Sequence, residues 1–139
     1  MKQKTEDKDT LSVDAGYSSK TGIMDYRGVW TSNGDVYFEK SFSVGTNNLG
    51  EFLAVVHALS VMKKDDLDND IYTDSVTAMA WVRNKKVNSK LPQNSENEYV
   101  WKVIRRAEDW LRNNSYKNKI LKWKTSEWGE IKADFNRKR

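Results

Sequence analysis

Hydrophobic and polar residues alternate along the first third of the chain, as they do in strands with one buried face. Residues 10–17 (TLSVDAGY) place Leu11 and Val13 on the same side of an extended segment. Residues 28–44 contain two more alternating runs, joined by Asn33-Gly34, a dipeptide typical of tight hairpins. Three antiparallel strands are therefore predicted to open the fold.

The pattern then changes to a helical period. Between about residues 48 and 63, the apolar side chains Leu49, Phe52, Leu53, Val56 and Leu59 recur every three or four positions. Asn48 is predicted to be the N-cap of this helix, and Glu51, three residues later, would complete a capping box. This local role alone would account for Glu51.

The second half of the chain alternates short strands with helices. IYT at 71–73 is predicted as a buried strand, and residues 74–82 begin a second helix capped by Asp74 or Ser75. Residues 96–114 form a third, amphipathic helix, residues 119–125 a last strand, and the segment from Gly129 begins a short terminal helix. The order β-β-β-α-β-α-α-β-α predicts a mixed sheet with helices on its faces.

Length and composition describe one domain without covalent cross-links. The 139 residues include no cysteine, so disulfides and thiolate chemistry are excluded. We expect residues 1–10 to be a disordered charged tail and residues 11–139 to be the folded domain. No stretch approaches the ~20 apolar residues of a membrane helix, and the N-terminus does not resemble a secretory signal. A cytoplasmic protein without membrane contact is therefore expected.

Positive charge is concentrated in two parts of the chain. The net charge is +4, but residues 102–139 contain twelve Lys or Arg against five Asp or Glu, and residues 83–90 read RNKKVNSK. Basic segments interleaved with Trp and Asn are typical of proteins that bind a polyanion. An ordinary lysine-rich surface explains them equally well, so charge alone does not decide between the two interpretations.

Four acidic residues fall at the boundaries of predicted elements: Asp14, Glu51, Asp74 and Asp134. Each has a local explanation as a cap or a surface charge. The carboxyl ends of strands in an open α/β sheet lie together, so several of these carboxylates are predicted to converge. Clustered carboxylates raise each other's pKa, and a cation relieves the repulsion. With oxygen donors and one histidine, the sequence favours Mg²⁺ or Mn²⁺ over zinc.

Four motifs together resemble those of bacterial ribonuclease H of type 1: SVDAGY, TNNLGEFLAVVHAL, IYTDSVTAMAWV and LKWKTSEWGEIKADF. The resemblance runs from about Leu11 to Lys138 and fits the branch without a long basic protrusion, since only KKVNSKLPQNSEN stands at that place. It implies an α/β, three-layer ribonuclease H-like fold. The mixed five-stranded sheet would have the order 3-2-1-4-5 with helices on both faces.

The resemblance also implies the activity. A monomer would bind an RNA/DNA hybrid and hydrolyse its RNA strand endonucleolytically, with two Mg²⁺ ions (Mn²⁺ substituting), leaving 5′-phosphate and 3′-hydroxyl ends. Asp14, Glu51, Asp74 and Asp134 match the metal-binding carboxylates. Glu130 matches an acid that supports metal positioning and product release, although it could instead pair with Lys132.

Further residues match the family's substrate contacts. Asn47 and Asn48 correspond to residues that touch the hybrid in the minor groove, and Thr46, Asn48 and Ser89 to a pocket for a DNA phosphate. Trp81 corresponds to an aromatic residue that packs on a sugar, although its helical spacing also suits a core residue. Thr125 completes the expected substrate-binding set.

The sequence departs from the family pattern at three places near these contacts. Val76 replaces an amide, Lys90 replaces a hydroxyl residue, and residues 17–20 replace a turn richer in glycine and asparagine. These departures affect the expected contacts with the substrate, whereas the four acids match the family pattern. His57, the only histidine, lies mid-helix and is predicted to be structural.

Two other functions of the same fold are compatible with parts of the pattern. One is a 3′–5′ exonuclease, which would use a different order of acids and a late His or Tyr that this tail lacks. The other is a non-enzymatic nucleic-acid-binding protein. A pure binder would gain affinity for a polyanion by losing the acids, and all four are present.

Overall fold

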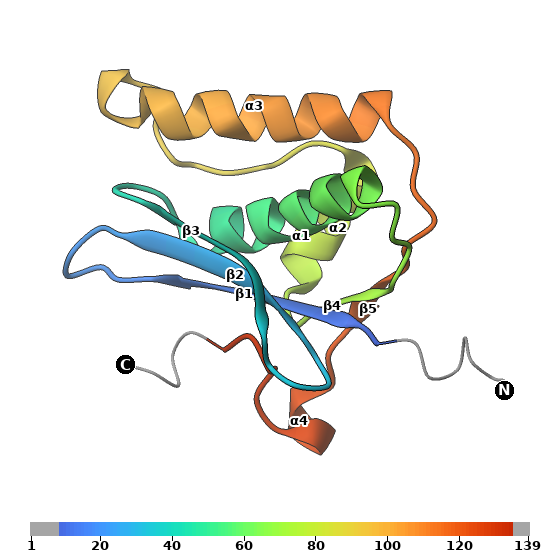
Figure 1. The fold of residues 1–139 in the computed structure, drawn as a ribbon. Coiled ribbons are helices and arrows are strands. Elements are labelled where there is room, and N and C mark those ends of the chain that lie inside the picture. The colour runs from blue at the N-terminus through green and yellow to red at the C-terminus, as the bar shows by residue number, and fades with distance from the viewer. Residues whose placement is uncertain (1–8, 135–139) are drawn as a thin grey trace, which may run out of the picture.

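A single mixed sheet organises the chain. The computed structural model describes residues 9–134, and its five-stranded sheet has the order β3-β2-β1-β4-β5, as predicted (Figure 1). The antiparallel part consists of β1 (Leu11–Tyr17), β2 (Met24–Trp30) and β3 (Val36–Phe42). Two short strands, β4 (Ile71–Thr73) and β5 (Ile120–Lys122), run parallel to β1 on its other side.

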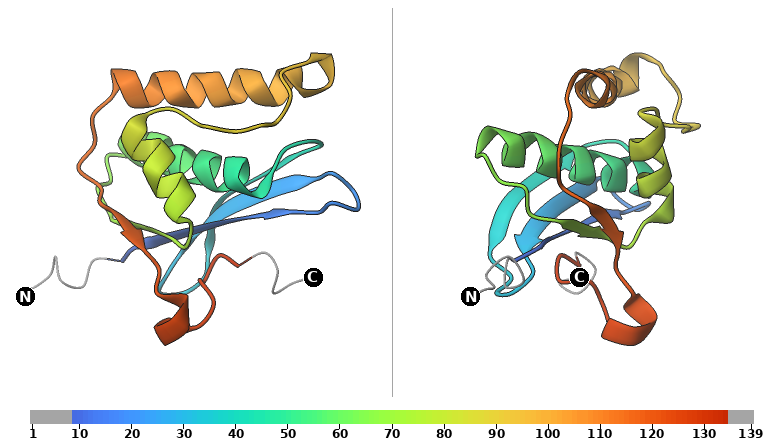
Figure 2. Two further views of the ribbon diagram at one scale, coloured as in Figure 1. Left: turned by 180° about the vertical axis from the view of Figure 1, so that it is seen from behind. Right: turned by 90° about the vertical axis from the view of Figure 1, so that its right-hand side faces the viewer.

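The helices lie on both sides of this sheet and give the predicted three layers. Helices α1 (Asn47–Lys64), α2 (Val76–Asn84) and α3 (Glu98–Asn113) lie together on one side, and a short 3₁₀ turn, η2 (Ser95–Asn97), precedes α3. The short helix α4 (Thr125–Trp128) and the segment that follows it lie on the other side (Figures 1 and 2). In the described part of the chain, no helix is long and apolar enough to span a bilayer.

Helix α1 is the centre of the core because it is covered on nearly every side. The predicted face of Leu49, Phe52, Leu53, Val56 and Leu59 is fully buried. Other faces of the same helix are buried as well, since α2 packs beside it and α3 packs on the side opposite the sheet (Figures 1 and 2). These further buried residues are Ala54, Val55, Ala58 and Met62.

Helix α1 packs closely on the sheet at Gly50. A Cβ atom at this position would lie 2.8 Å from the Cβ of Ala15 and 3.1 Å from Cγ of Met24. Since real Cβ atoms are essentially never this close to other side-chain atoms, the missing side chain lets the first turns of α1 rest directly on β1. Glu51, the next residue, is thereby brought beside that strand.

The structure corrects the predicted cap of α1 and chooses between the two predicted caps of α2. The N-cap of α1 is Thr46, whose hydroxyl accepts the Leu49 N–H at 3.1 Å, so Asn48 is inside the helix and Glu51 closes no capping box. For α2, the structure selects Ser75 over Asp74, because the Ser75 hydroxyl accepts the Ala78 N–H. Hydroxyl and amide caps have similar preferences, so sequence alone separates them poorly.

The β2–β3 connection is a five-residue loop, 31–35, instead of a tight Asn-Gly turn. The Asn33 side chain accepts the Asp35 N–H at 2.9 Å, and the Gly34 N–H donates to the Trp30 carbonyl at 2.7 Å. Asp9 and Thr10, which the sequence assigns to the disordered tail, bind this loop through Ser32 and Thr31. Residues 1–8 lie outside the described part of the chain.

The last helix lies earlier than predicted. Residues 125–128 form α4, whereas 129–134 contain turns and no helix. Trp123 explains this shape, because its indole N–H donates to the Gly129 carbonyl at 2.8 Å and bends the chain after α4. The predicted helix beyond Asp134 falls outside the described residues.

His57 is structural, as expected. Its ring stacks on Phe38 with centroids 4.2 Å apart, and Nδ1 lies 2.8 Å from the Tyr26 hydroxyl. Burial, and secondarily the charge of Lys40, lower the pKa of His57 to about 4. The ring is therefore neutral at physiological pH and belongs to an aromatic cluster between α1 and the β2–β3 pair.

The contact at Gly50 gives a first prediction. Gly50→Ala should lower the free energy of unfolding by about 1–3 kcal/mol through overpacking, although alanine improves intrinsic helix propensity by ~1 kcal/mol. Chemical denaturation in chelator measures the change. Ser60→Ala in the same helix is the control and should be neutral or slightly stabilising. A Gly50→Ala protein as stable as the parent would show that α1 can shift away from β1 at no cost.

Candidate active site

The predicted acids converge where the sheet divides. Strand β1 pairs with β2 along its whole length, but it pairs with β4 only at Leu11–Ile71 and Ser12–Tyr72. The chain leaves β1 toward β2 and leaves β4 toward β5, so the gap between β1 and β4 is a topological switch point. Ligand sites of open α/β sheets form at such points.

Three carboxylates from three elements meet in this gap. One oxygen each from Asp14, Glu51 and Asp74 lies within 4.8 Å of the others. Asp14 is in the middle of β1, Glu51 in the second turn of α1, and Asp74 directly after β4. Asp14 and Glu51 are only 5 % and 3 % exposed, whereas Asp74 is half-buried and opens the group to solvent.

The proximity of these groups disfavours full ionisation without a cation. Burial raises the pKa of Glu51 far above its usual range, and the charge of Asp14, a hydrogen bond with Asp14 and the charge of Asp74 raise it further. The pKa of Asp74 is also raised, chiefly by burial; Lys122 opposes this, while Asp134 and Glu130 add to it. The metal-free protein therefore retains a proton on Glu51 at neutral pH.

One oxygen in the group lacks a partner. Oε1 of Glu51 is buried and accepts no hydrogen bond, an arrangement that costs about 1–3 kcal/mol in a folded protein. A divalent cation would satisfy this oxygen and neutralise the clustered charge. Because all the donors are carboxylate oxygens, the site suits a hard ion such as Mg²⁺ or Mn²⁺.

Asp134 and Glu130 lie at the border of this group. Asp134 is buried at the end of a turn in which its N–H donates to the Ile131 carbonyl, but its carboxylate is outside the 4.8 Å group. Glu130 is exposed and makes no ion pair with Lys132, so that alternative is wrong. Both acids nevertheless act on Asp74 electrostatically.

Arg27 connects the C-terminal segment to the sheet, a role that the sequence analysis missed. Arg27 is the cross-strand partner of Asp14, and it is buried. Its guanidinium donates to the carbonyls of Ala133 at 2.9 Å and Asp134 at 3.3 Å. An arginine within a largely buried strand was the available signal. Its partner, however, is 106 residues away and cannot be found from local pattern.

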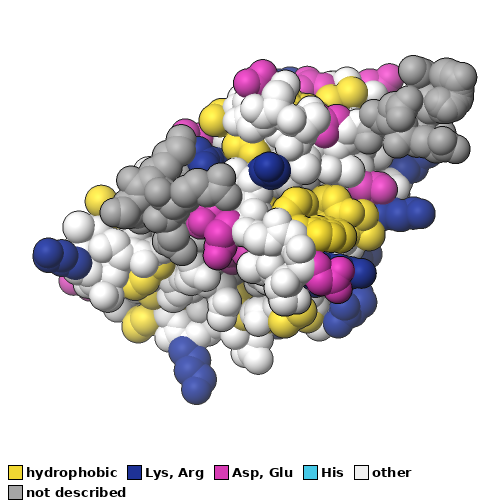
Figure 3. Space-filling view, turned by 90° about the horizontal axis from the view of Figure 1, so that it is seen from below, with side chains coloured by type: hydrophobic (Ala, Val, Ile, Leu, Met, Phe, Trp, Pro, Cys, Tyr) yellow, Lys and Arg dark blue, Asp and Glu magenta, His cyan; other side chains and the backbone are white. Residues whose placement is uncertain are grey.

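The same face also carries exposed aromatic surface. Trp128 of α4 is 46 % exposed and packs edge-on against Trp123 and Tyr72 at 5.0 and 5.8 Å. Figure 3 shows hydrophobic side chains gathered among acidic and basic ones on this side of the molecule. Thr125, a predicted substrate residue, begins α4 and is half-buried.

The other predicted substrate residues surround a separate pocket of about 490 Å³. Thr46 and Asn48 line it from the start of α1, Trp81 from α2, and residues 88–91, including Ser89 and Lys90, from the loop after α2. Trp81 is only 9 % exposed and packs edge-on against Phe52, so it is a core residue that also forms the pocket wall. Asn47 is exposed beside this pocket without lining it.

Comparisons with known proteins agree with this geometry. The sequence model of the RNase H family matches residues 7–135. Among solved structures, the chain is similar to LC11-RNase H1, isolated from compost by a metagenomic approach, with a TM-score of 0.56 and 16% identity over 86% of each chain. It is also similar to RNase H1 from the halophilic archaeon Halobacterium salinarum, with a TM-score of 0.52 and 15% identity over 81% of this chain and 82% of that one.

The fold and the carboxylate group define a nuclease-type site on a mixed α/β sheet. Because the family model covers nearly the whole sequence, the chain belongs to the RNase H family. It is a ribonuclease H, a hydrolase of the type that cuts the RNA strand of RNA/DNA hybrids.

The raised pKa of Glu51 predicts how the metal-free protein responds to pH. The folded state holds a proton that the unfolded state releases near pH 4.5, so stability should fall as pH rises above that value. Glu51→Gln should remove this loss and raise the thermal midpoint at pH 8 in chelator by about 3–8 °C, as 1–2 kcal/mol would.

The same variant should lose most of the stabilisation that Mg²⁺ gives the parent, because a ligand bound only to the folded state raises its midpoint. Thermal melts at pH 5 and pH 8, with Mg²⁺ and with chelator, measure both effects. Equal pH slopes for the parent and Glu51→Gln would contradict the assignment of this proton to Glu51.

Proposed function

We propose that the chain is an endonuclease that hydrolyses the RNA strand of RNA/DNA hybrids by a two-metal-ion mechanism, leaving 5′-phosphate and 3′-hydroxyl ends. The observation that carries this proposal is the group of Asp14, Glu51 and Asp74 at the switch point, with one Glu51 oxygen lacking a partner. Acids placed only for stability would have their oxygens paired.

Asp14, Glu51, Asp74 and Asp134 would hold two Mg²⁺ ions, with Mn²⁺ as a substitute. Bound there, the ions would supply an activated water and neutralise charge on the departing 3′-oxygen. The protein provides the frame: Asp14 and Asp74 project from neighbouring strands, and Glu51 from a helix that packs closely on β1 at Gly50. Arg27 holds the backbone of Asp134 near the group, and Glu130 would adjust the site from its exposed position.

The pocket beside α1 would hold the substrate. Thr46, Asn48 and Ser89 offer hydroxyl and amide groups suited to a phosphate of the DNA strand, and Trp81 offers an aromatic edge to a sugar. Asn47 and Asn48, both exposed at the start of α1, would contact the minor groove, where the 2′-hydroxyl distinguishes RNA from DNA. Thr125 would contact the substrate from the α4 side.

A single assay separates this function from the alternatives. Hybrid, double-stranded RNA and double-stranded DNA, each with an internal label, are incubated with Mg²⁺ and with excess chelator. We expect internal cuts in the RNA of the hybrid alone, and none in chelator. Stepwise shortening from a 3′ end would indicate an exonuclease, and binding without cleavage would indicate a non-enzymatic binder.

Asp74→Asn tests whether this carboxylate is a metal ligand that cleavage requires. The change deletes one negative ligand while keeping the shape, so the cleavage rate should fall by at least ~10³, or ~4 kcal/mol of barrier. The fold should be retained, since Asp74 does not cap α2 and repulsion in the group decreases. Thermal midpoint, hybrid affinity at fixed salt and cleavage rate are measured together, with Asp35→Asn in the exposed hairpin loop as the control. A folded, binding variant with more than a tenth of the parent rate would exclude a metal-ligand role for Asp74.

Replacing Asn47 and Asn48 together with alanine tests recognition of the RNA. Thr46 supplies the cap of α1, so stability should change little, while the efficiency of hybrid cleavage should fall by about tenfold or more. Asn113→Ala, an exposed amide in the last turn of α3, is the control. Steady-state kinetics and a thermal melt measure the two effects. Unchanged kinetics would leave the two amides without a role in recognition.

A further inference from the structure

The segment between α2 and α3 has to hold its shape without helix or strand hydrogen bonds. We refer to residues 85–93 as the connector. Its middle, residues 88–91, forms one wall of the substrate pocket opposite Thr46, Asn48 and Trp81. Residues 87–93 carry no helix or strand, so contacts made by other elements must fix the position of this wall.

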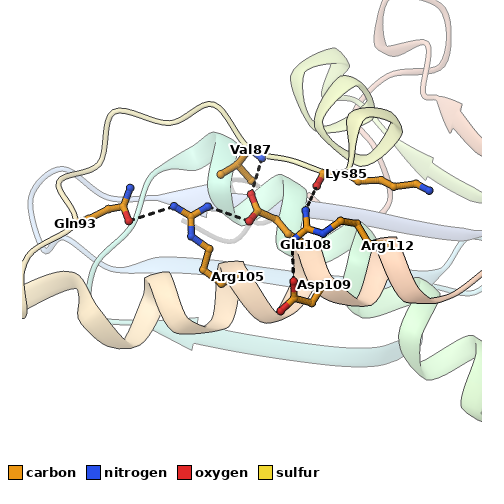
Figure 4. Close-up of polar contacts among 7 residues, drawn as sticks. All are labelled: Lys85, Val87, Gln93, Arg105, Glu108, Asp109 and Arg112. Carbon is orange, nitrogen blue, oxygen red and sulfur yellow. Dashed lines mark hydrogen bonds and ion pairs between the residues drawn. The ribbon is translucent and has the colours of Figure 1, made fainter.

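The buried carboxylate of Glu108 on α3 makes the central contact. Glu108 is 2 % exposed, and its Oε2 accepts the Val87 N–H at 2.9 Å. Its Oε1 accepts Nη1 of Arg105 at 2.9 Å, and Nη2 of the same guanidinium donates to Oε1 of Gln93 at 3.2 Å (Figure 4). One acid thus holds the connector directly at Val87 and, through Arg105, at Gln93.

Other side chains of the same region support both ends of the connector. Arg112 of α3 donates to the Lys85 carbonyl at 3.0 Å, next to the Glu108 contact (Figure 4). At the far end, the Asn97 amide at 2.8 Å and the Trp101 indole N–H at 3.2 Å both donate to the Pro92 carbonyl. The anchors therefore flank residues 88–91 on both sides and leave the pocket wall between them.

Stability alone does not require an acid at this place. Replacing a buried ion pair by well-packed apolar residues is often neutral or stabilising, and position 108 lies on the inward face of an amphipathic helix. A carboxylate has a property that no apolar side chain and no amide shares here. It accepts hydrogen bonds on both oxygens, and so it joins two donors from different parts of the connector.

We propose that Glu108 is a positioning residue for substrate binding: with Arg105, it holds residues 88–91 in the geometry that receives a backbone phosphate of the nucleic acid. This inference rests on the proposed function of the pocket. Loosening the connector would add the cost of ordering it to each binding event. The rate of the cleavage step should stay the same, because the three clustered carboxylates lie on β1, on α1 and after β4, outside the connector.

Two variants of one residue test the proposal. Glu108→Leu removes both acceptors at similar volume, and Glu108→Gln can keep only one of them. We expect KM for a hybrid to rise about tenfold for Leu and about threefold for Gln, with kcat within twofold of the parent. The same order is expected for the Kd of the hybrid, measured in an Asp74→Asn background in which cleavage does not interfere.

The direction in which hybrid affinity changes distinguishes a positioning role of Glu108 from an effect of its negative charge. Removing one negative charge should by itself favour binding of a polyanion. Glu98→Gln, at an exposed acid in the first turn of α3, makes the same change of charge at a side chain outside the hydrogen bonds that hold the connector, so its KM should stay equal or fall. Weaker binding by the Glu108 variants would run against the charge effect. Hydrogen exchange of the Val87 amide relative to amides of α3 reports whether the connector alone has loosened.

Each outcome is decisive. KM and Kd within twofold of the parent, with faster exchange at Val87, would overturn the proposal, as would a fall in kcat with KM unchanged. If Glu108→Leu does not fold, Glu108→Gln with the same readouts decides. A parent that cleaves no hybrid would refute the proposed function instead, and Kd in the Asp74→Asn background would still test the connector.

Discussion

The direct contact of α1 with β1 at Gly50 is the constraint on which the rest of the molecule depends. It sets how deep the helix lies on the sheet, and α2 and α3 then pack on other faces of α1. It also fixes the next residue, Glu51, against the strand that carries Asp14. The burial that raises the pKa of Glu51 is therefore a consequence of core packing, so the helix that forms the hydrophobic core also supplies a carboxylate of the acidic group.

Two buried glutamates show how hydrogen bonding separates a structural acid from a binding one. Glu108 and Glu51 are almost equally inaccessible. Both oxygens of Glu108 receive donors, from Val87 and Arg105, so its charge is compensated within the protein. One oxygen of Glu51 receives none, and its nearest charged neighbours are acids. The first arrangement fixes a segment of chain, whereas the second leaves the carboxyl to be neutralised by a proton or by a cation from outside the polypeptide.

Features set by periodicity could be predicted from the sequence, and features set by distant partners could not. Alternation and helical spacing predicted the strands and the buried face of α1, and the positions of the four acids at element ends singled them out. The resemblance to a family added the sheet order and the role of these acids in holding metal. Of those four acids, the structure groups Asp14, Glu51 and Asp74 and leaves Asp134 at the border. The choice of Thr46 over Asn48 as cap depends on small differences in local geometry. Arg27 and Glu108 bind partners 106 and 21 residues away, which no local pattern encodes.

The site thus has two parts with different mechanical support. The carboxylates project from a strand, a helix and the end of a second strand, all held by backbone hydrogen bonds and core packing. One wall of the proposed substrate pocket is a connector held by side chains of α3 and η2. The departures from the family pattern follow this division. Lys90 lies on the connector, and Val76, 65 % exposed, is the first residue of α2, whereas the clustered acids keep the family pattern. Surface positions tolerate substitution better than a packed group of like charges does. The residues proposed to contact the substrate can therefore differ from the family pattern while the group of carboxylates stays unchanged.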